Sequence, residues 1–277
     1  MPFDFLIPLA THPDPTPEAA LGRVADLAAT LTGRVTAVVH ELDVPPLNNP
    51  VAEVLANVSE LAAEAEARSG TRAAALIARL EQLARYFHLD FETRRLRCRS
   101  AELSQRLARL ARTYDYILTV VAKDSVAQRE LAEATIFGAG GPVIVLPGEE
   151  APAHLNSVFV AWDGSRAAAR AVRDALPILR IAKGVTVVTV EDDKPIGPGG
   201  AAELHAFLAF HGVESRHSST TRASKPIGVA LQTHALEQDA GMLVMGAYGH
   251  SWLQELVLGG ATKEVIAHPR LPVLVSH

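Results

Sequence analysis

The chain has 277 residues, a formal net charge of −5 and 48% apolar residues, which is enough sequence for two domains with substantial cores. The acidic balance argues against a nucleic-acid-binding protein, which would normally carry a basic surface. The single cysteine, Cys98, excludes an intrachain disulfide, and the sequence contains no run of about twenty apolar residues that would span a membrane. The N-terminal residues lack the basic segment of a signal peptide, so we expect a soluble, cytoplasmic protein.

Short apolar runs alternate with amphipathic segments through the first half of the chain, and this alternation predicts strands and helices in turn. The expected strands are residues 5–9, 35–40, 90–97, 116–121 and 142–147, and the expected helices are residues 18–31, 51–87, 101–112 and 127–134. The segment 51–87 is either one helix or two. Its apolar positions stay in phase across Gly70, but a glycine inside a helix costs about 1 kcal/mol relative to alanine.

The pattern restarts after residues 148–154, whose composition is typical of a linker. The expected strands of the second half are residues 158–162, 185–190, 214–219, 242–245 and 272–275, and the expected helices are residues 166–179, 201–211, 226–238 and 262–268. Residues 214–219 are polar, which is typical of an edge strand. We therefore expect two tandem α/β domains, 1–148 and 155–277, each with an open five-stranded parallel sheet.

Glycines separate a strand from a helix near the C-terminus. Gly246 and Gly249 frame a turn after an apolar strand, and Gly259 and Gly260 directly precede a helix. Glycine has no Cβ to keep a ligand away, and the N–H groups at a helix N-terminus favour phosphate. This spacing predicts a phosphate site, with ordinary loop glycines as the alternative.

Ligands of open parallel sheets bind beyond the carboxyl ends of the strands. Three segments should meet there: residues 161–163, Val190 and the loop 246–262. An ionised Asp163 can only accept hydrogen bonds, as ribose hydroxyls require. Its alternative role is to cap the helix that follows, for which Ser165 is better suited.

Positive charge for a polyphosphate has two candidate sources, His250 and Lys263. For Lys263, a solvated position on a helix is at least as reasonable. The remaining histidines form no H-x3-H arrangement and the chain has no C-x2-C pair, so we expect no metal site. The arginines at positions 94, 95, 97 and 99 indicate a solvated strand edge.

These residues give the second half a recognisable pattern: it resembles a universal stress protein domain, whose nucleotide-binding members carry G-x2-G-x9-G-[ST]. Both spacings are matched by Gly246, Gly249 and Gly259, but Gly260 stands where the pattern has Ser or Thr. Asp163 and the closing strand 272–275 also match. The resemblance covers residues 156–277 well and residues 3–147 as a degenerate copy, and it implies a Rossmann-like, adenine-nucleotide alpha-hydrolase-like fold.

The resemblance also implies one adenine nucleotide site, for ATP or AMP with or without Mg²⁺. The residues that it places there are Ala161, Asp163, Val190, Gly246, Gly249, Gly259, Gly260, Ala261 and Thr262, and we expect their neighbours Trp162, Met245, Tyr248 and His250 to join them. Gly260 removes a hydroxyl that would touch a phosphate, so we expect weaker binding, for which Thr262 could compensate.

The first half is expected to lack this site. Ala10 takes the place of Asp163, and Lys123, Asp124 and Ser125 stand where the glycines should be. The glycines at 138, 140 and 141 come later and indicate the turn into the next strand. We therefore expect the first half to serve mainly as a packing partner.

Three functions remain open. The first is a regulatory protein whose nucleotide occupancy alters its conformation or its choice of an unknown protein partner. The second is a slow ATP hydrolase or nucleotidyl transferase, which would have only His250 and Asp163 for proton transfer. The third is a dimerisation module with a vestigial site. Members of the family commonly pair through the strand that matches residues 272–275, so we expect the two halves to pair, a homodimer to form, or both.

Overall fold

The computed structural model describes residues 2–45, 58–193, 196, 199–247 and 260–277. The first half contains β1 (Phe3–Leu9), α1 (Glu18–Thr30), β2 (Gly33–Leu42), α3 (Val58–Tyr86), β3 (Asp90–Cys98), α4 (Ser100–Ala111), β4 (Tyr116–Val121), α5 (Val126–Gly138) and β5 (Val143–Pro147). The second half contains β6 (Val158–Ala161), α6 (Arg166–Ile181), β7 (Val185–Val190), α7 (Gly200–Phe210), β8 (Ser215–Thr220), α8 (Ile227–Glu237), β9 (Met242–Gly246), α10 (Ala261–Ala267) and β10 (Val273–Ser276). All ten expected strands are confirmed.

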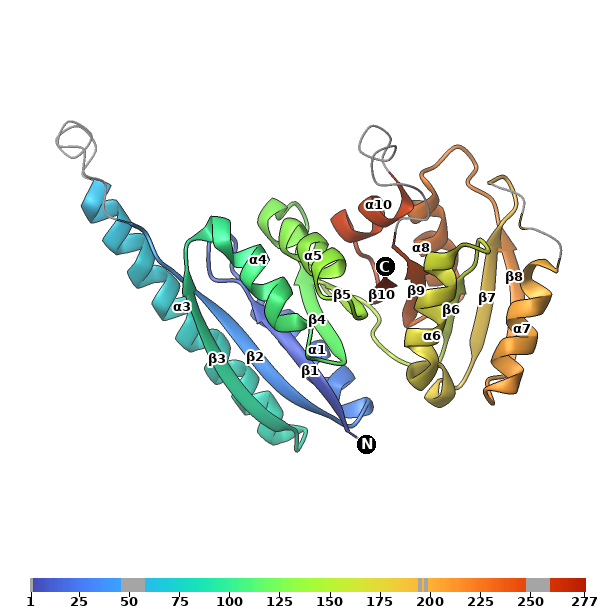
Figure 1. Cartoon of the computed structure of the whole chain (residues 1–277), viewed down its shortest axis with the longest axis horizontal. Helices are drawn as coiled ribbons and strands as arrows, with labels where there is room; N and C mark the ends of the chain where they lie inside the picture. The colour runs from blue at the N-terminus through green and yellow to red at the C-terminus, as the bar shows by residue number, and fades with distance from the viewer. Residues whose placement is uncertain (1, 46–57, 194–195, 197–198, 248–259) are drawn as a thin grey trace.

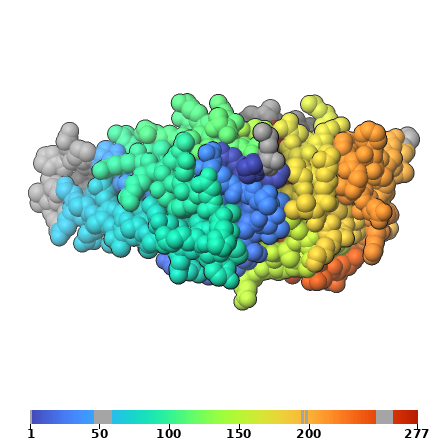
Figure 2. Space-filling view, turned by 90° about the horizontal axis from the view of Figure 1, so that it is seen from below, coloured from blue at the N-terminus to red at the C-terminus, as the bar shows by residue number. Residues whose placement is uncertain are grey.

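The two sheets expected from the sequence join into a single ten-stranded sheet with the order β3-β2-β1-β4-β5-β10-β9-β6-β7-β8. Neighbouring strands are parallel within each half, and the two halves meet where β5 pairs with β10 in antiparallel register, Val273 opposite Val145. Each half therefore repeats the same strand order on its side of this seam (Figure 1). The molecule is elongated as a result (Figure 2).

Helices cover both faces of the sheet, because successive strand residues point to opposite sides. One core cluster contains Phe5 and Ile7 of β1 and is covered by α1, α3, α6 and α7. The other contains Leu6 of β1 and is covered by α4, α5, α8 and α10. Both clusters include residues from the two halves, so the apolar core continues across the seam.

The sheet ends in two polar edge strands, as the sequence predicts. β8 lies at one end, and β3, with its arginines, lies at the other. On β3, Arg95 pairs with Glu41 of the neighbouring strand, and Arg97 pairs with Asp43 at a distance of 3.1 Å. These charges make the edge unfavourable for pairing with another strand.

Helix α3 resolves a question that the sequence leaves open, and helix α5 corrects one prediction. α3 continues through Gly70 as one helix, and a Cβ built on Gly70 meets no atom within 4 Å. α5 extends to Gly138, so Gly138 is part of a helix and not of the turn into β5. A Cβ there would lie 2.5 Å from the Cβ of Ala108, so glycine allows α5 to pack closely on α4.

Within the described residues, no helix is both long enough and apolar enough to cross a membrane.

Candidate functional site

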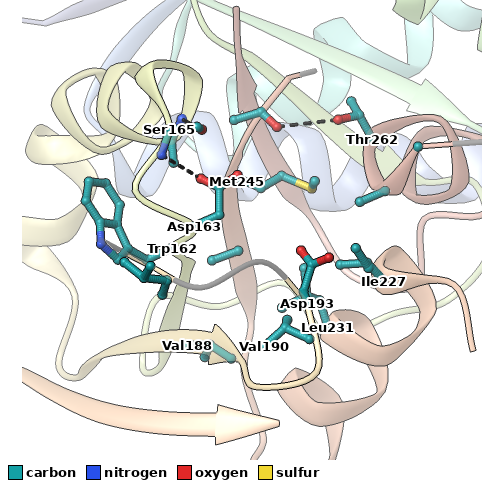
Figure 3. Close-up of a pocket in the computed structure, with 16 residues that line it drawn as sticks. Trp162, Asp163, Ser165, Val188, Val190, Asp193, Ile227, Leu231, Met245 and Thr262 are labelled. Atoms are coloured by element: carbon teal, nitrogen blue, oxygen red, sulfur yellow. Dashed lines mark hydrogen bonds between the residues drawn. The ribbon is translucent and has the colours of Figure 1, made fainter. Parts of the chain in front are cut away.

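A cleft of about 180 Å³ lies at the carboxyl ends of β6, β7 and β9 in the second half (Figure 3). The strand ends form its floor, while α8 and the start of α10 form walls. The described residues that line it are Ala161, Trp162, Asp163, Ser165, Ala168, Val188, Val190, Asp193, Ile196, Ile227, Leu231, Met245, Gly246, Gly260, Ala261 and Thr262. The structure thus brings together residues 161–163, Val190 and the described ends of the loop 246–262, at the place where parallel sheets bind ligands.

The segment after β6 presents Asp163 beside the N-terminus of α6. Ser165 caps this helix, because its side-chain oxygen accepts a hydrogen bond from the Ala168 N–H at 3.1 Å. The Asp163 Oδ1 atom accepts a hydrogen bond from the Ser165 N–H at 2.9 Å. Gly164 between them has a φ of 74°, a conformation that favours glycine. This local turn holds an exposed carboxylate at the mouth of the cleft.

Trp162 forms a side wall of the cleft. Its indole Nε1–H donates a hydrogen bond to the Gly200 carbonyl at 3.3 Å, and its ring packs against the core that lies under α6 and α7. Figure 3 shows the ring at the side of the cleft. The indole therefore joins the end of β6 to the start of α7.

Gly246 ends β9 in close contact with the first turn of α6. A Cβ on Gly246 would lie 2.4 Å from the Ala167 carbonyl carbon and 2.5 Å from the Ala168 nitrogen. Glycine is therefore required here by the packing of strand on helix, in addition to lining the cleft. Val120 takes the equivalent position of the first half, according to the registers of β1 with β4 and β6 with β9.

Thr262 connects α10 to the end of β9. Its side chain is 3% exposed, and its Oγ1–H donates a hydrogen bond to the Gly246 carbonyl at 3.4 Å. This contact fixes the helix over the cleft. The Thr262 hydroxyl, which the sequence suggests as a possible substitute donor to a phosphate, thus donates to the protein backbone in this structure.

Gly260 is the N-cap of α10, with extended backbone and no side-chain cap. The first backbone hydrogen bond of the helix runs from the Glu264 N–H to the Gly260 carbonyl. The Ala261 amide precedes this bond, at the first residue of the helix. It also lines the cleft. The helix starts with backbone donors next to the cleft.

Several predicted site residues are not among the described residues that line the cleft. Tyr248, Gly249, His250 and Gly259 lie outside the described residues. Lys263 is exposed on α10 and is not among the cleft residues. Within the described residues, no three His, Cys, Asp or Glu side chains lie close enough together to hold a metal ion.

Seven described lining residues were not predicted as site residues from the sequence: Ser165, Ala168, Val188, Asp193, Ile196, Ile227 and Leu231. Ile227 and Leu231 are four residues apart and so share a face of α8, which is a signal that the sequence contains. Val188 lies two residues before Val190 on the same face of β7. Asp193 carries no comparable signal, because its direction depends on how the loop after β7 turns.

The corresponding region of the first half is filled by the protein's own side chains. Phe5 pairs with Val35 as Val158 pairs with Val185, which places Ala10 at the position of Asp163. The Ser125 Oγ–H, at the N-cap of α5, donates to Asp14 Oδ2 at 2.9 Å. A carboxylate of the chain thus occupies the start of α5, where a helix N-terminus favours an anion.

Gln128 completes this internal filling. It is 2% exposed, and its Nε2 donates to the Asp14 and Pro15 carbonyls, each at 3.1 Å. Its Oε1 accepts from the Ala122 N–H at 2.8 Å. The loop after β1 is therefore bound directly to α5.

Helix α3 closes the rest of that region. The Thr11 hydroxyl donates to the His40 carbonyl at 2.7 Å and is hydrogen-bonded to Ser69 of α3 at 2.8 Å. The Leu42 N–H donates to Ser69 Oγ at 3.0 Å. These groups are buried. The Thr11 hydroxyl, the His40 carbonyl and the Leu42 N–H therefore find their partners within the protein.

The universal stress protein family model matches residues 155–277. Among solved structures, a universal stress protein from Archaeoglobus fulgidus DSM 4304 is similar over 98% of this chain and 95% of that chain, with a TM-score of 0.67 and 15% identity. A functionally unknown protein, PA1789 from Pseudomonas aeruginosa PAO1, is similar over 98% of this chain and 92% of that chain, with a TM-score of 0.57 and 16% identity. A search of curated proteins found no match.

At these identities the similarity to solved structures establishes a shared fold over nearly the whole chain, while the family model identifies the second half. Residues 155–277 are therefore a universal stress protein domain, and the first half repeats the fold of that domain within the same chain.

Proposed function

We propose that the second half binds an adenine nucleotide, ATP or AMP, and that the protein acts as a nucleotide-dependent regulator. The observation that carries this proposal is the convergence of three segments on one cleft: the turn at Asp163, the end of β7 at Val190 and the start of α10 at Gly260. Open parallel sheets bind nucleotides at such strand ends.

The cleft offers different chemistry along its length, as a nucleotide requires. Val188 and Val190 of β7 face Ile227 and Leu231 of α8 (Figure 3), and this apolar slot suits a flat base. Asp163 offers an acceptor for ribose hydroxyls. The start of α10 offers backbone donors for a phosphate.

The charge of the cleft affects how many phosphate groups a bound nucleotide can carry. The charged side chains among its described lining residues are Asp163 and Asp193, both acidic. A triphosphate would add negative charge to a cleft that already carries two carboxylates, and the repulsion raises the free energy of binding. AMP, or ATP with Mg²⁺ to offset its charge, therefore fits the described lining better than free ATP.

A regulatory role is supported by the contacts of α6, which begins at the cleft and touches the first half. The Tyr116 hydroxyl of β4 donates to the Asp174 carbonyl of α6 at 2.7 Å. The Arg170 Nη2 donates to the Gly140 carbonyl at 3.3 Å. A ligand that shifts the start of α6 would therefore move groups that the first half binds.

Isothermal titration calorimetry with AMP, and with ATP in the presence and absence of Mg²⁺, tests the proposal. We expect one site per chain, and we expect Asp163→Ala to weaken AMP binding by about 10- to 100-fold, the effect of losing a charge-assisted hydrogen bond. The matched control is Ala10→Asp, which places a carboxylate at the equivalent position of the first half. It should create no second site, because that region is already filled.

Chromatography of the nucleotide after incubation would show whether ATP is hydrolysed. Failure of both nucleotides to bind the unmodified chain at millimolar concentration would refute the proposal. Equal binding to the Asp163→Ala variant would place the nucleotide elsewhere.

A further inference from the structure

The loop after β7 places three acidic residues in succession, Glu191, Asp192 and Asp193, and the structure uses them differently. The Ser219 hydroxyl donates to Glu191 Oε1 at 2.6 Å. The Arg222 N–H donates to Asp192 Oδ1 at 2.7 Å. Both contacts attach the loop to β8 and the residues that follow it. Within the described part of the chain, the Asp193 carboxylate has no such partner, and it lines the cleft.

Asp193 lies on the side of the cleft that is otherwise apolar. Figure 3 shows its carboxylate beside Ile227, Leu231 and Val190, directed into the cleft. Asp163, the other acidic group, lies across the cleft beside the start of α6. The slot between β7 and α8 therefore combines flat apolar walls with one carboxylate.

This combination limits which chemical groups a ligand can place in the slot. An ionised carboxylate accepts hydrogen bonds and donates none. A bound group that displaces water from it must supply a donor, because an unpaired charge next to apolar side chains is costly. A ligand atom that is itself an acceptor would be repelled at this position.

We propose that Asp193 determines base specificity by accepting a hydrogen bond from the exocyclic amino group of a 6-aminopurine, and that it rejects 6-oxopurines. This inference rests on the proposed nucleotide site and adds the group that reads the base. Adenine presents an amino donor at position 6, whereas hypoxanthine presents a carbonyl acceptor there. The ribose and phosphate of AMP and IMP are the same, and the bases differ at position 6 and at N1, which is an acceptor in adenine and a donor in hypoxanthine. The Asp193→Asn variant is therefore needed to assign the discrimination to this residue.

Calorimetric titration of the full chain with AMP and with IMP tests the proposal. We expect the unmodified chain to bind AMP roughly 10- to 100-fold more tightly than IMP, the range for a hydrogen bond to a charged group. In Asp193→Asn the new amide can both accept and donate. We expect IMP to gain affinity and the ratio of the two dissociation constants to fall to about threefold or less.

The matched control is Asp192→Asn, which removes the same charge one residue away. The amide oxygen of the introduced side chain would still accept from the Arg222 N–H, and the AMP to IMP ratio should stay at the value of the unmodified chain. Far-ultraviolet circular dichroism and thermal melts of both variants would verify that they fold, which we expect because both positions lie in a surface loop.

The outcomes separate the two proposals. If AMP binds and IMP binds equally well, or if Asp193→Asn leaves the ratio unchanged, Asp193 does not read the base, while the nucleotide site stands. If the unmodified chain binds neither nucleotide, the proposed function fails and this inference fails with it.

Discussion

The two halves share a strand order, but the surroundings of their strand ends differ. The strand ends of the second half border a cleft, whereas those of the first half are covered by other parts of the protein. In the second half the described residues after β6 and β7, the end of β9 and the start of α10 line a cleft. In the first half the loop after β1 is bound to α5 through Asp14 and Gln128, and to α3 through Ser69. The same architecture can therefore leave a ligand site open or fill that site with the protein's own side chains.

The connection that follows the fourth strand of each half explains part of this difference. Four residues, 122–125, join β4 to α5, whereas residues 247–260 join β9 to α10. The short connection starts α5 immediately beside the loop after β1, where Asp14 reaches its N-cap. Four substitutions test this difference between the two halves.

The largest effect is expected from Gln128→Ala, which removes the side chain that binds the first-half loop to α5. We expect a loss of about 3 kcal/mol in the free energy of unfolding, because three backbone groups lose a partner in a buried region. Urea denaturation measures it. The exposed neighbour Glu130 serves as the control, and Glu130→Ala should have little effect. A Gln128→Ala protein as stable as the unmodified chain would show that the filling is incidental.

Gly246→Ala tests whether the second half needs its glycine for packing. The added Cβ would lie 2.4 Å from the Ala167 carbonyl carbon, and we expect the free energy of unfolding to fall by about 2 kcal/mol. AMP binding should weaken as well, since the start of α6 would shift. The control is Gly22→Ala in α1, where a Cβ meets no atom within 4 Å. That change should leave stability equal or higher. Equal melting temperatures for Gly246→Ala and the unmodified chain would contradict the packing role.

Tyr116→Phe probes the contact between the halves. Loss of the hydrogen bond to the Asp174 carbonyl should cost about 1 kcal/mol. Burial raises the pKa of the Tyr116 hydroxyl above its ordinary value, so the folded state retains a proton that the unfolded state releases above pH of about 10. Stability should therefore fall as pH rises above that point, and less so in Tyr116→Phe. Identical alkaline profiles for the two proteins would show that Tyr116 is not responsible.

His40→Gln is expected to have the smallest effect, confined to acidic pH. His40 stands where the second half has Val190, and burial lowers the pKa of its imidazole. Below the ordinary histidine pKa of about 6.5 the unfolded state binds a proton that the folded state resists, so stability is lost as pH falls. Glutamine can still donate to the Cys98 carbonyl, which His40 Nε2 contacts at 3.0 Å, but it does not titrate. Urea denaturation at pH 5 and pH 7 should show that His40→Gln loses less unfolding free energy on acidification than the unmodified chain. The control, His268→Gln, changes an exposed histidine and should lose as much as the unmodified chain does.

Local sequence patterns predicted the elements well, because each strand is a short apolar run between helical segments with clear ends. Ser165 was recognised as a helix cap for the same reason, since capping depends on neighbouring residues only. For the first half, the sequence predicts only that the carboxylate and the glycines of the site are missing, not that the region is filled. The bond between Asp14 and Ser125 joins residues 111 positions apart, and no local pattern reports such a pair. The inward direction of Asp193 and the contact of Gly246 with α6 likewise depend on tertiary packing.

The antiparallel pairing of β5 with β10 has a consequence for stoichiometry. A dimer of identical domains has two equal copies of every surface, and a substitution in one copy appears in both. Here the two partners are parts of one polypeptide whose sequences differ at the strand ends, so a cleft and its filled counterpart occur in a constant ratio of one to one. Nucleotide uptake should then follow a simple hyperbola without cooperativity between the two halves, and a titration should saturate at a single equivalent per polypeptide.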